Sequence, residues 1–174
     1  MVFDILDGFD VLINAAAYTN VDGAEDQKEL AHAVNSNAPG AMARACLRHD
    51  IPMIHISTDY VFDGQNEVPY EPHDATAPLG VYGKTKLSGE KEVMAAGGRA
   101  LVLRTSWVYD GLGKNFLTTM LRLSETRDAL SVVDDQIGRP TFTGHLALAT
   151  LKAAEVFVHN SAMAFDVYLS LIHI

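Results

Sequence analysis

The sequence predicts an α/β protein in which helices cover both faces of a parallel sheet. Short, continuously apolar segments, typical of strands buried on both faces, alternate along the chain with longer helix-forming segments. Polar residues gather directly after several apolar segments, where parallel strands bring their carboxyl ends to one edge of the sheet. Strands and helices in this order require right-handed crossovers. We therefore expect one doubly wound domain.

The composition is that of a soluble globular protein. Of its 174 residues, 48% are hydrophobic and 20% charged, enough apolar residues for the core of one domain. The formal charge of −9, with scattered Lys and Arg, argues against nucleic acid or a membrane surface as partner. There is no signal-peptide pattern and no apolar run approaching the roughly 20 residues that span a bilayer. The single cysteine, Cys46, is expected to be buried in a cytoplasmic protein.

The first half of the chain contains two expected strands, at residues 10–14 and 51–57. Between them lie two helix-forming segments, residues 22–33 and residues 35–49, the second with Pro39 in its first turn. Three alanines follow the first strand, and their small side chains suit either a flat ligand close to the backbone or tight helix-on-sheet packing. The second strand leads into a polar run that suits either a ligand site or a simple Ser/Thr turn.

In the second half, Pro78 precedes a helix that holds Tyr82 and Lys86 and ends at Gly97-Gly98. The remaining expected elements are a strand at 99–105, a helix at 115–126, a short strand at 129–133, a polar loop at 134–141 and a helix at 143–159. The final apolar segment, residues 168–174, is either a strand separated from its partners or foreign to the domain.

Tyr82 and Lys86 are four residues apart, so they share one face of the expected helix. A free tyrosine has a pKa of roughly 10, and a nearby ammonium is expected to lower it, which makes the phenol a usable acid or base. By itself this spacing usually marks an ordinary surface pair. Its weight increases because Thr58 and Trp107 follow neighbouring strands and are expected at the same edge of the sheet.

These side chains match the groups needed to reduce a carbonyl. Tyr82 would give a proton to the developing alkoxide, and Thr58 would hydrogen-bond the same oxygen. Lys86 would keep the phenol acidic and hold a ribose hydroxyl. No amino-acid side chain supplies hydride, so the chemistry implies a nicotinamide cofactor.

Five segments together resemble the dTDP-4-dehydrorhamnose reductase family, which belongs to the extended short-chain dehydrogenase/reductases. The segments are Asn14-Ala-Ala-Ala-Tyr-Thr19, Ser57-Thr-Asp-Tyr-Val-Phe-Asp-Gly64, Tyr82-Gly-Lys-Thr-Lys86, Arg104-Thr-Ser-Trp-Val-Tyr109 and Asp135-Gln-Ile-Gly-Arg-Pro-Thr141. The resemblance covers roughly residues 10–150. It implies an NAD(P)-binding Rossmann-like doubly wound parallel sheet.

The resemblance also implies an activity and a set of site residues. The family reduces the 4-keto group of dTDP-4-dehydro-6-deoxy-L-mannose with NADPH or NADH, giving dTDP-L-rhamnose for bacterial cell-surface polysaccharide. By this resemblance the catalytic residues are Thr58, Tyr82 and Lys86. The residues implied to line the cofactor are Ala15, Ala16 and Tyr18, together with Tyr82 and Lys86. Those implied to face the nucleotide-sugar are Tyr60, Trp107, Asn115 and Arg139. The asparagine that supports a proton relay in this superfamily is either Asn35 or Asn37.

The sequence departs from the family pattern at both ends. The family opens with a strand and a Gly-x-x-Gly-x-x-Gly turn that binds the cofactor pyrophosphate, and nothing similar precedes Asp10. We therefore expect residues 1–160 to be a truncated Rossmann-like core without the N-terminal glycine-rich βαβ unit. Residues 161–174 are expected to be a truncated or foreign tail. Such a fragment should be weakly active alone, with exposed sheet edges that a homodimer would cover.

Two other functions fit parts of the pattern. Nucleotide-sugar epimerases and dehydratases use the same Thr, Tyr and Lys, and Asp59 stands where a dehydratase has an extra acid. The Ser-Trp-Val-Tyr and Asp-Gln-x-Gly-x-Pro-Thr segments favour a reductase. A non-catalytic NADP-binding regulatory subunit is the second alternative, because such relatives of the family can keep the tyrosine and lysine.

Overall fold

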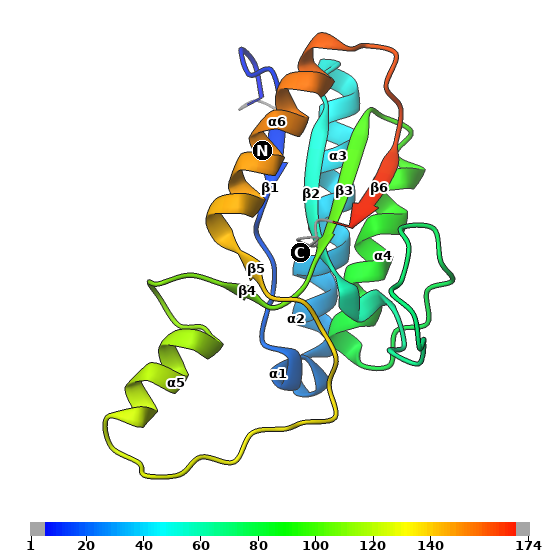
Figure 1. Ribbon diagram of the computed structural model, residues 1–174. Coiled ribbons are helices and arrows are strands. Elements are labelled where there is room, and N and C mark those ends of the chain that lie inside the picture. The colour runs from blue at the N-terminus through cyan, green and yellow to red at the C-terminus, as the bar shows by residue number, and fades with distance from the viewer. Residues whose placement is uncertain (1–5, 170–174) are drawn as a thin grey trace.

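The computed structural model describes residues 6–169, and within them a four-stranded sheet forms the centre of the molecule (Figure 1). The strands are β1 (Leu12–Asn14), β2 (Met53–Thr58), β3 (Ala100–Thr105) and β6 (Asp166–Leu169), in the spatial order β1-β2-β3-β6. All three pairings are parallel, which confirms the predicted sheet. The register places Thr58 beside Thr105, so β2 and β3 end together at one edge.

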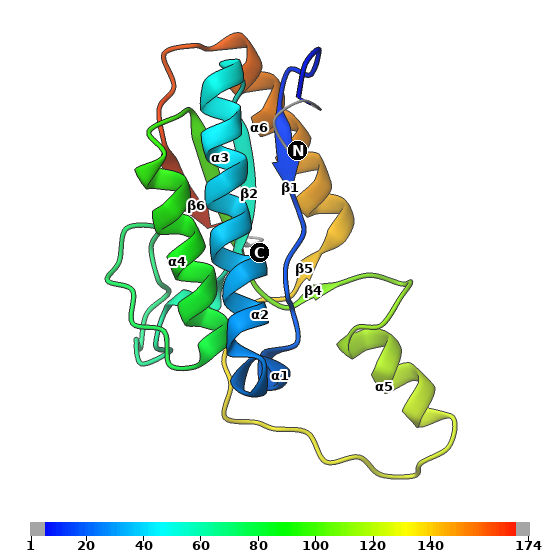
Figure 2. The ribbon, with the colours of Figure 1, turned by 180° about the vertical axis from the view of Figure 1, so that it is seen from behind.

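Helices cover both faces of this sheet, as Figures 1 and 2 show. The helices are α1 (Val21–Asp26), α2 (Lys28–His32), α3 (Ala38–His49), α4 (Val81–Ala95), α5 (Phe116–Ser124) and α6 (Thr143–His159). Helices α3 and α4 lie against one face and α6 against the other. Two short strands, β4 (Val108–Tyr109) and β5 (Thr141–Phe142), form a separate parallel pair.

Two apolar layers separate the sheet from its helices. On the α3 and α4 side, the buried side chains include Cys46, Met53 and Val93. On the α6 side, Leu103 packs in a cluster with Phe157. Helix α6 has the predicted bounds because its apolar residues recur with helical spacing.

Several predicted boundaries shift for local reasons. The predicted helix 22–33 is interrupted at Gln27, where φ is −117° and ψ is 49°. The predicted helix 35–49 begins within a π-helical turn, η1 (Ala33–Asn37), before α3 takes over. Asp50, with φ of 53°, ends α3 in the left-handed conformation. These breaks place α1, α2 and η1 beside the start of α4 (Figure 2).

One expectation about the second half was wrong, and the tail predicted at 161–174 takes part in the sheet as far as residue 169. The expected strand at 129–133 does not form: residues 125–140 connect α5 to β5 without a strand, and Val132 and Val133 are exposed. Branched side chains favour a strand only where a neighbouring strand pairs with it. Part of the expected tail instead continues the sheet, because β6 pairs with β3. Residues 170–174 lie outside the described residues, as do residues 1–5.

Cys46 is buried as predicted, with 2% of its surface exposed, and burial raises the pKa of its thiol to about 11. Among residues 6–169, no helix is long and apolar enough to cross a membrane.

Candidate active site

Thr58 and Tyr82 meet at the carboxyl edge of the sheet. Thr58 is the last residue of β2, and Tyr82 lies in the first turn of α4. The Thr58 hydroxyl donates to Asp59 Oδ1 at 3.1 Å, and Thr58 lies close enough to Tyr82 to lower the pKa of its phenol. The Tyr60 ring packs edge-on against the Tyr82 ring, with 5.6 Å between the centroids and 79° between the planes. The Tyr60 amide donates to Thr58 Oγ1 at 3.2 Å, which fixes the turn after β2. The structure thus brings together three residues predicted from two separate segments.

Lys86 lies one turn after Tyr82 on α4, and only 1% of its surface is exposed. Its ammonium donates a hydrogen bond to the Ile56 carbonyl oxygen at 2.7 Å. Burial lowers the pKa of Lys86 to about 8, and the nearby Glu90 carboxylate acts in the opposite direction. The amine is therefore held close to the end of β2, with its charge partly maintained by an anion on the same helix.

The expected direction of the Tyr82 pKa was wrong. Burial raises the pKa of this phenol above its ordinary value, and Asp59 and Tyr60 add to the rise, while the hydrogen bond with Thr58 lowers it. An ammonium lowers a phenol pKa only when it lies close enough to outweigh desolvation. Tyr82 is therefore protonated near neutral pH, as a proton donor must be.

Two glycines let α4 approach the site closely. A Cβ at Gly83 would lie 2.2 Å from the Tyr60 carbonyl oxygen, and one at Gly89 would lie 2.0 Å from the Asn35 carbonyl oxygen. Both distances are too short for any other residue without movement of the backbone. We did not predict this role, although glycine inside a helix is an unfavourable choice that signals a packing reason.

Asn35 connects the segment after β1 to α4. Its side-chain oxygen accepts from the Tyr18 amide at 2.8 Å, and its amide group donates to the Tyr18 carbonyl at 3.1 Å and to Thr85 Oγ1 at 3.2 Å. Asn37 is exposed and lines an open surface pocket between α2 and α4. Of the two candidates for the relay asparagine, Asn35 is therefore the one built into the site.

The alanine segment after β1 is held by a pair of polar residues that we did not predict. Asn14 Oδ1 accepts from the Ala16 amide at 3.1 Å, and Asn14 Nδ2 lies 3.0 Å from His55 Nδ1. Burial lowers the pKa of His55 to about 3, and Lys86 contributes to the decrease, so the ring is neutral and Nδ1 accepts. The signal available in the sequence was the presence of the polar residues Asn14 and His55 within two otherwise apolar strands. Ala15 and Ala16 are exposed beyond this pair.

Trp107 and Arg139 lie on segments that are tied together after β3. Ser106 Oγ donates to the Arg139 carbonyl at 2.6 Å, and the Thr141 amide donates to the Trp107 carbonyl at 3.2 Å. Trp107 has a φ of 45°, and its half-exposed indole packs against Gly138, where a Cβ would lie 2.6 Å from the ring. The two predicted substrate residues are thus neighbours.

Within residues 6–169, the Asn115 side chain caps the start of α5. Its side-chain oxygen accepts from the Thr118 amide at 3.0 Å, and its amide group donates to the Asp110 and Leu112 carbonyls. It is the N-cap of α5, which Figure 1 shows apart from the sheet. The structure does not bring Asn115 to Thr58 and Tyr82, so its predicted contact with substrate stays a prediction.

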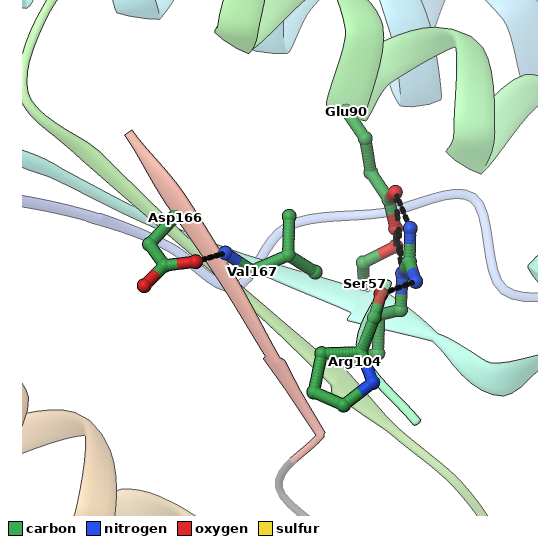
Figure 3. Close-up of polar contacts among 6 residues, drawn as sticks. Ser57, Glu90, Arg104, Asp166 and Val167 are labelled. Atoms are coloured by element: carbon green, nitrogen blue, oxygen red, sulfur yellow. Dashed lines mark hydrogen bonds and ion pairs between the residues drawn. The ribbon is translucent and has the colours of Figure 1, made fainter. Parts of the chain in front are cut away.

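A buried ionic network joins α4 to β2 and β3 (Figure 3). Glu90, one turn after Lys86 on α4, receives two hydrogen bonds from Arg104 Nε and one from Arg104 Nη2, at 3.0, 3.2 and 2.7 Å. Ser57, the residue before Thr58, donates to Glu90 Oε1 at 2.5 Å. Arg104 Nη1 donates to the Pro72 carbonyl at 2.8 Å. We did not single out Glu90, although a charged residue two turns from Tyr82 on the same helix face was visible in the sequence.

One part of the carboxyl edge of the sheet, between the end of β1 and the first turn of α4, is compatible with cofactor binding. The exposed methyl side chains of Ala15 and Ala16 leave the backbone at the end of β1 open to a flat group, and the half-buried Tyr82 lies on the first turn of α4. Among residues 6–169, no group of three or more His, Cys, Asp or Glu side chains is arranged to hold a metal ion.

The parallel sheet with helices on both faces defines a Rossmann-like α/β protein. A dTDP-4-dehydrorhamnose reductase structure from Clostridium acetobutylicum superposes on 99% of this chain with a TM-score of 0.90 and 37% identity. One from Bacillus anthracis, in complex with NADP, superposes on 99% with a TM-score of 0.90 and 34% identity. The chain belongs to the RmlD substrate binding domain family, whose model matches residues 3–170.

Curated relatives agree with this assignment. The dTDP-4-dehydrorhamnose reductase of Aggregatibacter actinomycetemcomitans is 44% identical over 170 residues, which are 97% of this chain and 58% of that protein. The enzyme of the same name from Mycobacterium tuberculosis is 50% identical over 159 residues, which are 88% of this chain and 52% of that protein. The chain thus spans a little over half the length of the curated relatives it matches.

Proposed function

We propose that this chain provides the proton-handling part of a reductase that uses NADPH or NADH to convert dTDP-4-dehydro-6-deoxy-L-mannose into dTDP-L-rhamnose. The observation that carries the proposal is the placement of Tyr82 in the first turn of α4, beside Thr58 at the end of β2, with the buried Lys86 one turn away. Relatives up to half identical in sequence are named dTDP-4-dehydrorhamnose reductase, which supports this substrate.

The cofactor would lie along the end of β1 and the start of α4. Ala15 and Ala16 would face it, Tyr18 would be held beside it by Asn35, and Lys86 would bind a ribose hydroxyl. A bound NADPH or NADH supplies the hydride that reduces the carbonyl carbon.

Tyr82 would donate its proton to the carbonyl oxygen as negative charge develops there. The raised pKa of Tyr82 keeps the phenol protonated until the oxygen becomes basic enough to take the proton. Thr58 would hold the same oxygen by a hydrogen bond, and the Lys86 ammonium would stabilise the resulting phenolate.

The nucleotide-sugar would lie between the Tyr60 ring and the segment that carries Trp107 and Arg139. Exposed aromatic surfaces suit stacking and apolar contact with sugar and base, and an arginine suits a phosphate. Tyr60 and Trp107 are 42% and 46% exposed, so both rings are available. We further place the protein in the cytoplasm and expect it to form a homodimer.

The test is an assay of the full-length gene product and of residues 1–174 with the keto-sugar and deuterium-labelled NADPH. The proposal predicts net consumption of NADPH and deuterium at carbon 4 of the sugar. A changed sugar with unchanged cofactor redox state would instead identify an epimerase or dehydratase. Binding of NADPH and of a partner enzyme in stoichiometric amount, without turnover, would identify a regulatory subunit.

A further inference from the structure

We propose that Glu90 is a positioning residue: with Ser57 and Arg104 it locks α4 against the ends of β2 and β3 and balances the charge around the Lys86 ammonium. This inference rests on the function proposed above for Tyr82 and Lys86. It assigns a role to a buried ionic network that the proton transfer itself does not use.

The first argument is geometric. Glu90 lies two turns after Tyr82 and one turn after Lys86, so all three residues share one face of α4. Its carboxylate is bound from two directions, by Ser57 on β2 and by Arg104 on β3 (Figure 3). Because α4 is tied to both strands, it cannot rotate without breaking these bonds.

The second argument is continuity with the catalytic turn. Ser57 is the residue directly before Thr58, so the Ser57–Glu90 hydrogen bond fixes the end of β2 at the point where Thr58 meets Tyr82. Arg104 extends the network to the Pro72 carbonyl and lies 5.1 Å above the centroid of the Phe62 ring. Ser57, before Tyr60 in the chain, binds the Glu90 carboxylate directly, and Phe62, after Tyr60, contacts it through Arg104.

The third argument is charge. Lys86, Glu90 and Arg104 are 1%, 4% and 5% exposed, so two cations and one anion share a region with little access to water. Burial lowers the pKa of the neighbouring His55 and keeps its ring neutral, and burial raises the pKa of the Asp59 carboxyl beside Tyr82. Glu90 is therefore the anion that offsets the burial of the Lys86 amine, and its effect on the pKa of Lys86 is upward.

The experiment measures the pKa of Lys86 by NMR in isotope-labelled protein, with the signal assigned through Lys86→Arg. Glu90→Gln keeps the size of the side chain but removes the anion, so we expect the Lys86 pKa to fall by roughly one unit or more. The matched control is Glu92→Gln on the same helix, whose ion pair with Arg44 is about half exposed. This control should leave the Lys86 pKa within about 0.2 units of the unmodified protein.

A double variant, Glu90→Gln with Arg104→Met, removes one anion and one cation. If the single variant does not fold, the Lys86 pKa is measured in the double variant, which has no unpaired buried charge at this position. It should return the Lys86 pKa to within about 0.5 units of the starting value. An unchanged Lys86 pKa in Glu90→Gln, or a further fall in the double variant, would overturn the proposal.

In the full-length reductase, Glu90→Gln should lower kcat by roughly tenfold or more while KM changes less than about threefold, because substrate does not touch Glu90. A loss confined to KM would contradict a positioning role. The two proposals fail separately: a shifted Lys86 pKa in a protein without reductase activity would contradict the proposed function and leave the role of Glu90 standing.

Discussion

Helices α4 and α5 present opposite cases within one molecule. Helix α4 mixes polar and apolar residues with little segregation, yet its buried residues include Lys86 and Glu90. Helix α5 has a clearly apolar face and no buried residue, and its Phe116 and Leu121 are 64% and 59% exposed. In Figure 2, α4 packs beside α3 while α5 stands apart from the sheet.

On these two helices, the burial of a side chain depends more on a specific hydrogen-bond or ion-pair partner than on the hydrophobic pattern of the helix. Each buried polar group on α4 has a named acceptor or counter-charge, such as Ile56 for Lys86 and Arg104 for Glu90. An unpartnered charge there would cost several kcal/mol. The apolar face of α5 has no such partner within residues 6–169. We expect substitutions around α4 to be costly and equivalent ones around α5 to be mild.

The largest expected difference in the free energy of unfolding is between breaking a buried ion pair and breaking an exposed one. Arg104→Ala leaves the Glu90 carboxylate buried without its counter-charge, so we expect a loss of about 3–5 kcal/mol in the free energy of unfolding. Arg44→Ala breaks the exposed pair with Glu92 and should cost less than about 1 kcal/mol. Urea denaturation of both variants measures the difference, and equal losses would contradict the comparison.

A second contrast uses one side-chain type in two places. Leu103→Ala opens a cavity in the cluster with Phe157 and should cost about 2–5 kcal/mol. Leu121→Ala on α5 should change the free energy of unfolding by no more than about 0.5 kcal/mol. A large loss for Leu121→Ala that grows with protein concentration would show that α5 packs against a second copy.

The buried ammonium gives a dependence on pH. The pKa of Lys86 falls from 10.5 to about 8 in the folded protein, so between these values the unfolded chain binds more protons. The contribution of Lys86 to stability therefore rises with pH across this window, by about 3 kcal/mol at most. Lys86→Met removes this contribution.

Urea denaturation of the original protein and Lys86→Met at several pH values between about 7.5 and 10.5 tests this sign. The stability of the original relative to the variant should increase with pH. A difference that stays constant or decreases would show that Lys86 is not buried as an ammonium near neutral pH.

The smallest contrast concerns glycine. Gly89→Ala gains helix propensity worth about 1 kcal/mol but places a methyl group 2.0 Å from the Asn35 carbonyl oxygen. We expect a net loss of roughly 1–2 kcal/mol, because neighbouring backbone must move. Gly111→Ala, where an added Cβ meets nothing within 4 Å, should stay within about 0.5 kcal/mol. A stabilised Gly89→Ala protein would show that α4 has room to shift.

Sequence reasoning succeeded where a pattern depends on neighbours along the chain. The strand predicted at 51–57, observed as Met53–Thr58, and the helix from Thr143 follow from apolar spacing, and the shared helix face of Tyr82 and Lys86 follows from helical periodicity. It failed where a property depends on distant partners. The pKa of Tyr82 depends on burial beside Tyr60, which no spacing reveals.

The same reasoning explains the other differences. The expected strand at 129–133 lacked a neighbouring strand, and pairing with a distant segment is not encoded in the branched residues themselves. The resemblance implies that Asn115 faces the substrate, which stays a prediction, and the structure adds that its side chain caps α5.

The central claim is that Tyr82 donates the proton and is positioned by Thr58 and α4. Its most direct test compares Tyr82→Phe with Tyr109→Phe in the full-length gene product, with kcat/KM for the keto-sugar as the readout. Each change removes one phenolic hydroxyl and keeps the ring. Tyr82→Phe should lower kcat/KM by about 100-fold or more, and Tyr109→Phe by less than about threefold. A Tyr82→Phe enzyme with kcat/KM within about threefold of the original would contradict the claim.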